Sequence, residues 1–312
     1  MARGGREAAA RGETGTDTAA RRATPAARRA TPVALTIAGS DSGGGAGIQA
    51  DLKAFARCGV HGCSAITAIT AQSTVAVSAI HPVPPEIVLA QVRAVLADIG
   101  VDAVKVGMLG NVQVTLAVAR ALDELPAGTP VVVDPVMVAE SGARLLDEDA
   151  QGALIAEIVP RASVLTPNLP EARVLAGRPA RAGGALTEKE EDEEALELVR
   201  AVLALGPGAV VLTGGHRARA VDLLLERARH EEDGEAAVVE IPGERHRDGA
   251  AHGSGCTHSA VLAARLAMGD TTLRAARVAR ALAGEAVARA LRDVGSGAGP
   301  VDVVGLERMR DS

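Results

Sequence analysis

Short apolar runs rich in β-branched residues alternate with segments of helical periodicity from Pro32 to the end of the chain. Because runs such as 131–133 carry no polar residue, both faces of the strands that they form must be buried. Strands of this kind are typical of a parallel sheet covered by helices on both faces. Strands are expected at residues 33–38, 64–70, 103–106, 131–134, 163–165 and 209–212, and helices at 47–57, 85–99, 256–266 and 272–291.

Two further apolar runs, 221–225 and 236–241, flank the polar segment 229–234, and this pattern predicts a hairpin at one edge of the sheet. The acidic run 188–194 is interpreted as the solvated start of a helix. No fixed-period repeat and no linker interrupts the chain after residue 31. The sequence therefore predicts an α/β fold with one doubly wound, mostly parallel sheet over residues 32–312.

The composition excludes several classes of function. The chain has one Phe, Phe55, and no Tyr or Trp, so it cannot build an aromatic cage for a quaternary amine or a stacking platform for single-stranded nucleic acid. No run of about 18 uncharged apolar residues is present, so no transmembrane helix is expected. Cys58, Cys63 and Cys256 are odd in number and lack zinc-ligand spacing, which argues against a disulfide framework and indicates the cytoplasm.

The net charge of −6 is unevenly distributed along the chain. Residues 1–31 hold seven Arg and three acidic residues, which leaves the rest of the chain strongly acidic. This composition predicts a disordered basic tail that is dispensable, and not a secretory signal. An acidic body without a basic patch is not expected to bind nucleic acid.

Glycines dominate the segment 39–47, which lies between the first expected strand and the first expected helix. Residues 45–50 formally match the G-x-G-x-x-A pattern of dinucleotide sites. Such a site needs an acidic residue about 20 positions later for the ribose, and residues 52–85 contain none. The glycines are therefore interpreted as a tight turn or as a close approach of the backbone to a small ligand.

A second glycine-rich segment, Gly253-Ser254-Gly255-Cys256, leads into the helix expected at 256–266. Backbone N–H groups at a helix N-terminus favour an anion, so this segment predicts an anion hole. The same field lowers the pKa of a thiol, which makes Cys256 a candidate base or nucleophile. The chain contains no G-x-x-x-x-G-K-[ST] loop that would provide another phosphate site.

Polar residues follow other expected strands at their carboxyl ends, where ligands bind in sheets of this type. Asp134 is interpreted as a strand-end cap or as a charged group in the ligand crevice. Asn168 and Glu171 match the capping box of a helix, but together with Asp134 they also provide hard oxygen ligands for Mg²⁺. Thr213 is followed by two glycines, against which a nucleotide could lie. The histidines show no spacing that predicts a zinc site.

Six ordered motifs resemble those of the ribokinase-like small-molecule kinases, and within them the hydroxymethylpyrimidine/phosphomethylpyrimidine kinases of thiamine biosynthesis. The motifs are AGSDSGGGAGIQAD at 38–51, TAQST at 70–74, KVGML at 105–109, DPVM at 134–137, TPNLPE at 166–171 and HGSGCT at 252–257. The resemblance covers the chain from about residue 32 to its end. It implies a ribokinase-like fold, ATP and Mg²⁺ as cofactors, and a cytoplasmic homodimer without nucleic-acid or membrane partners.

The resemblance also implies phosphoryl transfer from ATP to 4-amino-5-hydroxymethyl-2-methylpyrimidine and then to its monophosphate. Gln72 would hydrogen-bond the ring and its amino group, because an amide offers both a donor and an acceptor, and Met108 would pack against the ring. Cys256 would be the catalytic base, although many relatives of wider kinship carry Asp there. Thr213 stands where many relatives have Lys, which counts against a lysine contact to the triphosphate. The other implied residues are Gly39, Asp51 and Val136 for the substrate, Asn168 and Gly215 with Thr213 for the nucleotide, Asp134 and Glu171 for the metal, and Gly253, Ser254 and Gly255 for the anion hole.

Two alternatives remain open. Pyridoxal kinase of the same superfamily is the nearer one, because its substrate ring also carries a hydroxymethyl group. From another class, Cys256 with His252 or His258 would serve a thiol-dependent hydrolase, but the sequence shows no group that orients the histidine. Trapping of an acyl-enzyme would support the hydrolase, and ATP consumption would exclude it.

Overall fold

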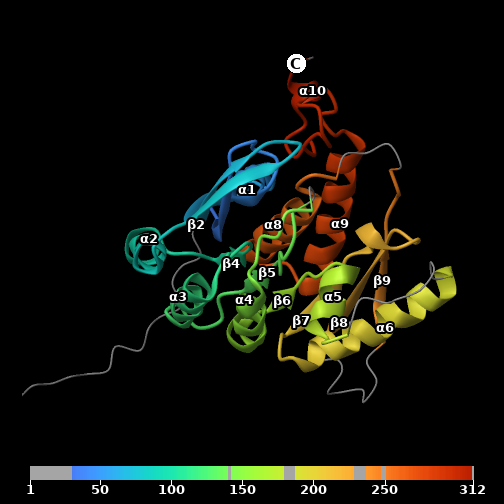
Figure 1. Cartoon of the computed structure of the whole chain (residues 1–312), viewed down its shortest axis with the longest axis horizontal. Helices are drawn as coiled ribbons and strands as arrows, with labels where there is room; N and C mark the ends of the chain where they lie inside the picture. Colours follow the sequence, from blue (N-terminus) through green and yellow to red (C-terminus); the bar gives the residue numbers. More distant parts are fainter. Residues whose placement is uncertain (1–29, 140–141, 179–186, 228–236, 247–250, 311–312) are drawn as a thin grey trace, which may run out of the picture. The chain divides into compact units, whose positions relative to one another are not determined.

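The computed structural model describes residues 30–139, 142–178, 187–227, 237–246 and 251–310. Within these residues the chain forms a nine-stranded sheet with helices on both faces (Figure 1). The tail predicted at residues 1–31, apart from its last two residues, lies outside the described residues. The polar turn predicted at 229–234 also lies outside them.

The sheet has the order β3-β2-β1-β4-β5-β6-β7-β8-β9. Its strands are β1 (Val33–Asp41), β2 (His61–Gln72), β3 (Val77–Pro82), β4 (Ala103–Val106), β5 (Val131–Val133), β6 (Val164–Leu165), β7 (Ala209–Leu212), β8 (Val221–Glu226) and β9 (Val239–Pro242). The strands from β2 to β7 in this order run parallel, whereas β3, β8 and β9 are antiparallel to their neighbours. This confirms the doubly wound, mostly parallel sheet and the antiparallel pair β8–β9 at its edge. The strand β3 was not predicted, because nearly all of its residues are exposed and leave no alternation to detect.

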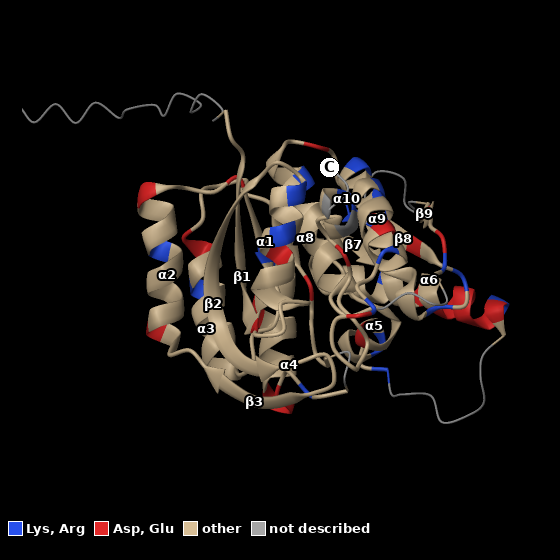
Figure 2. Cartoon of the chain, turned by 90° about the horizontal axis from the view of Figure 1, so that it is seen from above, with Lys and Arg blue, Asp and Glu red and all other residues tan. Residues whose placement is uncertain are grey.

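Several helices begin at a residue whose side chain accepts a hydrogen bond from a backbone N–H of the first turn. Asn168 and Glu171 form a reciprocal capping box at the start of α5, and Thr187 with Glu190 does the same for α6. The predicted acidic start of α6 is confirmed, and its acidic residues gather at one end of that helix (Figure 2). The helices are α1 (Gly47–Arg57), α2 (Pro85–Asp98), α3 (Val112–Asp123), α4 (Glu148–Ala153), α5 (Leu169–Leu175), α6 (Glu188–Ala204), α8 (Ser254–Ala267), α9 (Thr272–Ala288) and α10 (Leu306–Arg310), with the short helical segments η1 (Leu154–Ile158), η2 (Val159–Arg161) and η3 (Gly214–His216).

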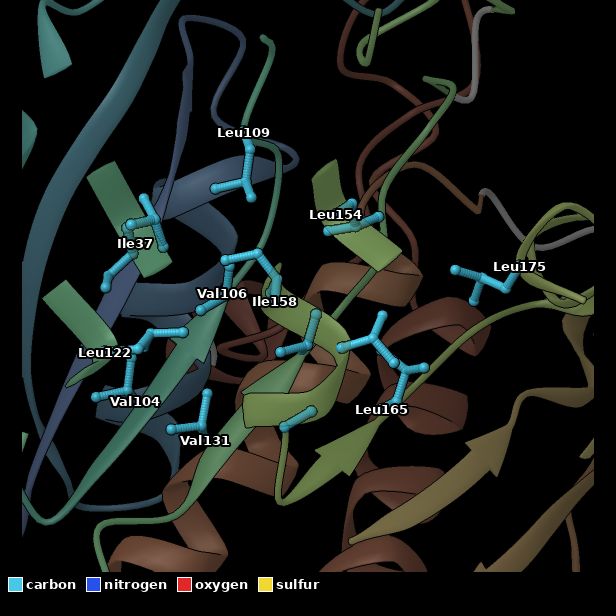
Figure 3. Packing of buried hydrophobic residues seen from close by; sticks show 14 of the residues in the cluster. Ile37, Val104, Val106, Leu109, Leu122, Val131, Leu154, Ile158, Leu165 and Leu175 are labelled. Atoms are coloured by element: carbon cyan, nitrogen blue, oxygen red, sulfur yellow. The ribbon is translucent and has the colours of Figure 1, made fainter. Parts of the chain in front are cut away.

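The two faces of the sheet pack against different helices. On one face, large aliphatic side chains of β1, β4, β5 and β6 pack with those of α3, η1 and α5 (Figure 3). On the other face, small residues such as Ala34 and Ala103 let the alanine-rich helices α8 and α9 approach closely. Successive strand residues point to opposite faces, so Lys105 lies on the same face as Ala103. A lysine is therefore buried between the sheet and the helices α1 and α8.

The carboxyl ends of the six parallel strands meet at one edge of the sheet. Strand β1 pairs with β2 on one side and with β4 on the other, so the chain changes direction across the sheet at this point. Ligands in open α/β sheets bind at such a switch point. None of the described helices is long and apolar enough to cross a membrane.

Candidate active site

A cavity of about 310 Å³ lies at the carboxyl edge of the sheet. Both glycine-rich segments and the ends of several parallel strands line it. Of the residues that the sequence predicted for the site, all but one contribute to its wall: Gly39, Gln72, Met108, Asp134, Val136, Asn168, Glu171, Thr213, Gly215, Gly253, Ser254, Gly255 and Cys256. The structure therefore brings together residues that are up to 217 positions apart in the sequence.

Asp51 is the exception, and its expected contact with the substrate is not supported. Its side chain is fully buried on α1, behind the cavity wall. Its Oδ2 accepts hydrogen bonds from Thr36 Oγ1 at 2.6 Å and from Lys105 Nζ at 3.0 Å. Lys105 itself lines the cavity. Asp51 thus acts on the site through Lys105, because it neutralises a fully buried ammonium group.

Lys105 stays charged in this environment. Burial by itself lowers the pKa of an ammonium group, but the negative charges of Asp51, of the Cys256 thiolate and of Asp134 outweigh it and raise the pKa of Lys105 above its usual value. Lys105 lies in one of the sequence motifs, but the sequence around a lysine in a strand does not show which acidic residue pairs with it. The partner comes from α1, 54 positions earlier in the chain.

The first glycine-rich segment is organised around Asp41. The Oδ2 of Asp41 accepts hydrogen bonds from the backbone N–H groups of Gly45 and Ala46 at 3.0 and 2.8 Å, and its Oδ1 accepts one from Gly43 at 2.8 Å. His252 Nε2 lies 3.1 Å from the same Oδ2. Burial raises the pKa of Asp41, but these hydrogen bonds outweigh it and hold the pKa below its usual value. Asp41 therefore fixes the turn of this segment and ties it to the second one.

The second glycine-rich segment forms the first turn of α8. Gly253 has a φ of +84°, and a Cβ atom there would lie 1.8 Å from the carbonyl oxygen of Gly45. Only glycine fits at this contact between the two segments. The helix N-terminus opens into the cavity through Ser254, Gly255 and Cys256, as expected for an anion hole.

The environment of Cys256 differs from the expectation of a lowered thiol pKa. Burial raises the pKa of Cys256 to about 12, with Asp134 and Asp51 acting in the same direction. Lys105 and the backbone N–H of Gly47 oppose this rise but do not cancel it. The helix N-terminus predicted a lower pKa because sequence shows the helix but neither the burial of the thiol nor the carboxylates that pack opposite. In the protein without ligands, the thiol is protonated at neutral pH.

Neither of the nearby histidines is paired with Cys256. His252 bonds to Asp41, and His258 Nε2 lies 3.1 Å from Asp222 Oδ2. A thiol hydrolase needs a histidine directed at its nucleophile. The arrangement therefore counts against the hydrolase alternative.

Asp134 and Glu171 provide two buried carboxyl groups at neighbouring strand ends. Ser259 Oγ donates a hydrogen bond to Asp134 Oδ2 at 3.0 Å. Burial, reinforced by the charge of Asp134, raises the pKa of Glu171 to about 8. The capping-box interpretation of Asn168 and Glu171 is confirmed, and both residues also line the cavity, so their role as metal ligands stays a prediction. A cation at this point would relieve the mutual repulsion of the carboxylates.

The donor set fits a magnesium ion better than a structural metal. No group of three or more His, Cys, Asp or Glu side chains that could hold a metal occurs among the residues that the structure describes. Two carboxylates are sufficient for Mg²⁺, which usually completes its coordination with water and substrate phosphates.

The far end of the cavity is formed by Thr213 and the turn of η3. A Cβ atom at Gly214 would lie 2.5 Å from the backbone nitrogen of Val221, so the turn packs flat against β8. The backbone N–H of Gly214 donates to Asp222 Oδ1 at 2.8 Å. Thr213 provides no charge here, as the sequence predicted, because it stands where many relatives have a lysine.

A positive charge at this end comes instead from Arg280 on α9, which sequence reasoning missed. Its guanidinium is mostly buried, lines the cavity and lies 3.7 Å from Asp222 Oδ1. The Nε of Arg280 has no hydrogen-bond partner within the described part of the chain. Arginine is common on helices, and nothing in the sequence near Arg280 distinguishes it from its neighbours.

Comparisons with known proteins agree with this geometry. A family model described as phosphomethylpyrimidine kinase matches residues 41–302. The chain is 46% identical over 272 residues to the hydroxymethylpyrimidine/phosphomethylpyrimidine kinase of Rhizobium meliloti, which covers 86% of this chain and 96% of the relative.

Solved structures show the same fold. A pyridoxal kinase from Staphylococcus aureus in complex with pyridoxal superposes with a TM-score of 0.75 at 30% identity, covering 90% of this chain and 96% of that one. A phosphomethylpyrimidine kinase from Clostridium difficile superposes with a TM-score of 0.68 at 34% identity, covering 82% and 100%. With its doubly wound ribokinase-like sheet and the six motifs gathered around one cavity, the chain belongs to the phosphomethylpyrimidine kinase family and is a phosphotransferase.

Proposed function

We propose that the protein transfers the γ-phosphoryl group of ATP to 4-amino-5-hydroxymethyl-2-methylpyrimidine, and then phosphorylates the monophosphate to the diphosphate used for thiamine diphosphate. One observation carries this proposal above the others: a polar amide, the N-terminus of a helix, two carboxyl groups and a glycine turn all line a single cavity. We name its three parts the pyrimidine end (Gly39, Gln72, Met108 and Val136), the charged centre (Lys105, Asp134, Glu171 and Cys256) and the nucleotide end (Thr213, Gly215 and Arg280).

The pyrimidine end holds the ring through shape and one amide. The Oε1 of Gln72 accepts a hydrogen bond from Thr70 Oγ1 at 3.2 Å, which orients the amide. The Sδ of Met108 would lie 3.0 Å from a Cβ atom at Gly39, so a side chain at position 39 would displace the methionine. Glycine at 39 thus lets the backbone and a soft thioether meet the ring from neighbouring strands.

The nucleotide end and the anion hole hold the phosphates. The guanidinium of Arg280 lines this part of the cavity and would place a positive charge near phosphate oxygens, in the role that Thr213 cannot fill. The first turn of α8 would accept the transferred group, where backbone N–H groups stabilise the charge that develops. Mg²⁺ held by Asp134 and Glu171, together with Asn168 next to the nucleotide, would neutralise phosphate charge.

In the reaction, the hydroxymethyl oxygen forms a bond to the γ-phosphorus while the bond from that phosphorus to the bridging oxygen of ADP breaks. The hydroxyl proton passes to the thiolate of Cys256, and the ammonium of Lys105 stabilises that thiolate. Because the thiol pKa is about 12 in the free protein, the base form is rare at neutral pH and the rate should rise with pH. Positioning and charge stabilisation supply most of the remaining acceleration.

Three further statements belong to the proposal, two from the resemblance and one, on residues 1–31, from the composition of the tail. The kinase domain would span residues 32–312, residues 1–31 would be dispensable for activity, and the enzyme would act as a cytoplasmic homodimer. Truncation before Pro32 followed by an assay of turnover tests the first two statements. The molecular mass of the enzyme in solution tests the homodimer.

The direct test is incubation of the purified chain with ATP, Mg²⁺ and the hydroxymethylpyrimidine, with mass spectrometry of the products. We expect the mono- and diphosphate of the pyrimidine. Pyridoxal is the decisive competitor, because a solved neighbour binds it. Formation of pyridoxal phosphate alone would replace the pyrimidine assignment with pyridoxal kinase.

A further inference from the structure

The segment after helix α9, residues 291–303, belongs to none of the motifs that predicted the site. It contains Gly295, Gly297 and Gly299, followed by Pro300. In the structure this C-terminal segment contacts two stretches of chain that carry cavity-lining residues: the turn after Gln72 and the start of the second glycine-rich segment. Figure 1 shows it beside the end of β2, the strand that carries Gln72.

The first contact is with the turn that follows Gln72. The backbone N–H of Gly297 donates a hydrogen bond to Thr74 Oγ1 at 3.2 Å. A Cβ atom at Gly297 would lie 2.0 Å from the carbonyl oxygen of Thr74, and one at Gly295 would lie 2.2 Å from Thr74 Oγ1. These distances leave no room for any side chain, so the two backbones are in direct contact.

The second contact is with the residue that precedes the anion hole. The backbone N–H of Val301 donates to the carbonyl oxygen of His252 at 3.1 Å, and Pro300 forms a short parallel bridge with His252. The carbonyl oxygen of Pro300 accepts a hydrogen bond from Leu291 N–H at 2.9 Å, which closes the segment into a loop. His252 is also the partner of Asp41. One loop therefore supports the anion hole and the turn after Gln72.

The turn after Gln72 needs such support because its strands are exposed. Most residues of β3 are exposed, and Ile69 on β2 is 53% exposed. On the inner side, Ser42 Oγ donates to the carbonyl oxygen of Gln72 at 2.7 Å and accepts from its N–H at 2.8 Å. The C-terminal segment supplies a second anchor two residues later.

We propose that the C-terminal segment is part of the active-site framework, and that Thr74, Gly295 and Gly297 are positioning residues that set where the Gln72 amide meets the pyrimidine. This inference rests on the proposed function and adds a specificity role to a segment outside the family motifs described above. The effect of substitutions at Thr74 and Gly297 should be confined to the pyrimidine, because Pro300 and Val301 make the separate contact with the anion hole and stay in place. Substitutions in the segment should therefore change affinity for one substrate and not for the other.

The test compares Gly297→Ala and Thr74→Val with the native chain. Misplacing the amide costs about one net hydrogen bond, so KM and the calorimetric Kd for the pyrimidine should rise about tenfold. KM for ATP should stay within about twofold. Thr74→Ser keeps the hydroxyl and should restore near-native values. Gly152→Ala is the matched control, since a Cβ atom there has no neighbour within 4 Å.

A second measurement separates positioning from a general loss of structure. Gln72→Leu already lacks the amide, so adding Gly297→Ala to it should cause little further loss of pyrimidine affinity. Unchanged pyrimidine KM in both single variants, or an equal rise in the KM for ATP, would overturn the inference. If the native chain phosphorylates no pyrimidine, the proposed function itself is wrong, and that result is obtained before any variant is made.

Discussion

The pyrimidine end and the charged centre of the cavity are held together by different forces. The pyrimidine end is neutral: Gln72, Met108 and Gly39 are placed by backbone contacts and by glycines that leave no spare room. The charged centre contains a fully buried Lys105 next to carboxyl groups whose pKa values are shifted by burial. A substitution that shifts a side chain at the pyrimidine end should change the affinity for one ligand. A substitution that removes a buried charge should change the stability of the fold, the pKa of the base and the metal site together. Substitutions in the two parts should therefore fail in distinguishable ways.

The largest expected effect is on turnover at the charged centre. Cys256→Ala removes the proposed base, and kcat should fall about 10²- to 10⁴-fold, the usual contribution of general base catalysis. Substrate affinity should change little, because the backbone of Gly253 to Gly255 remains. Steady-state kinetics with each substrate measures both quantities.

Cys256→Asp supplies the control for that experiment. A carboxyl group has a much lower intrinsic pKa than a thiol, so in the same buried environment a larger share of this variant carries the base form at neutral pH, and it should keep appreciable activity. The native rate should rise between pH 6 and pH 9, because a thiol with a raised pKa loses its proton only as pH increases, and the Asp variant should lose this rise. A native rate in Cys256→Ala would show that the proton leaves by another route.

Breaking the buried ion pair should cost stability as well as activity. Lys105→Met leaves Asp51 as an uncompensated buried charge, so the free energy of unfolding should fall by about 3 to 5 kcal/mol. Urea denaturation followed by circular dichroism measures this loss. The double variant Lys105→Met with Asp51→Asn removes both charges and keeps an acceptor for Thr36. It should recover most of the stability, and equal losses in the single and double variants would argue against the pairing.

At the neutral end, the expected effect is smaller and selective. Gln72→Leu removes the paired polar edge and leaves groups of the pyrimidine unsatisfied, a loss of about 1 to 3 kcal/mol in binding. Calorimetry should show nearly native affinity for ATP. An equal loss of ATP affinity would contradict the assignment of Gln72 to the pyrimidine end.

The smallest effect is expected at the nucleotide end. Arg280→Met keeps much of the buried aliphatic stem but removes the guanidinium, so affinity for ATP should fall about tenfold, the value of one charge-assisted hydrogen bond. Pyrimidine affinity should not change. Arg277→Met on the same helix, at a residue outside the cavity lining, serves as control. Native ATP affinity in Arg280→Met would show that Arg280 does not bind the phosphates.

Much of the framework followed from local patterns. The helix α1 and the strands β4 and β7 have the predicted bounds, because apolar periodicity and β-branched runs act over a few positions. Thirteen of the fourteen predicted site residues line one cavity, since motifs at the carboxyl ends of parallel strands must meet at one edge. Their individual roles remain predictions. The strand β3 was missed because an exposed edge strand has no buried face, so its sequence shows no alternation of apolar and polar residues.

The sequence by itself determined the alternation of strands and helices, the two glycine-rich turns and the set of polar residues at strand ends. Each of these depends on backbone conformation or on which residues avoid water, and both are local properties. Only the tertiary structure decided that Asp51 pairs with Lys105, that Arg280 lines the nucleotide end, that burial together with nearby carboxylates raises the pKa of Cys256, and that the C-terminal segment meets Thr74. The pairing of Lys105 with Asp51 spans 54 positions, and the contact of Gly297 with Thr74 spans 223. Such contacts depend on what packs opposite a residue across the fold, which no local pattern encodes.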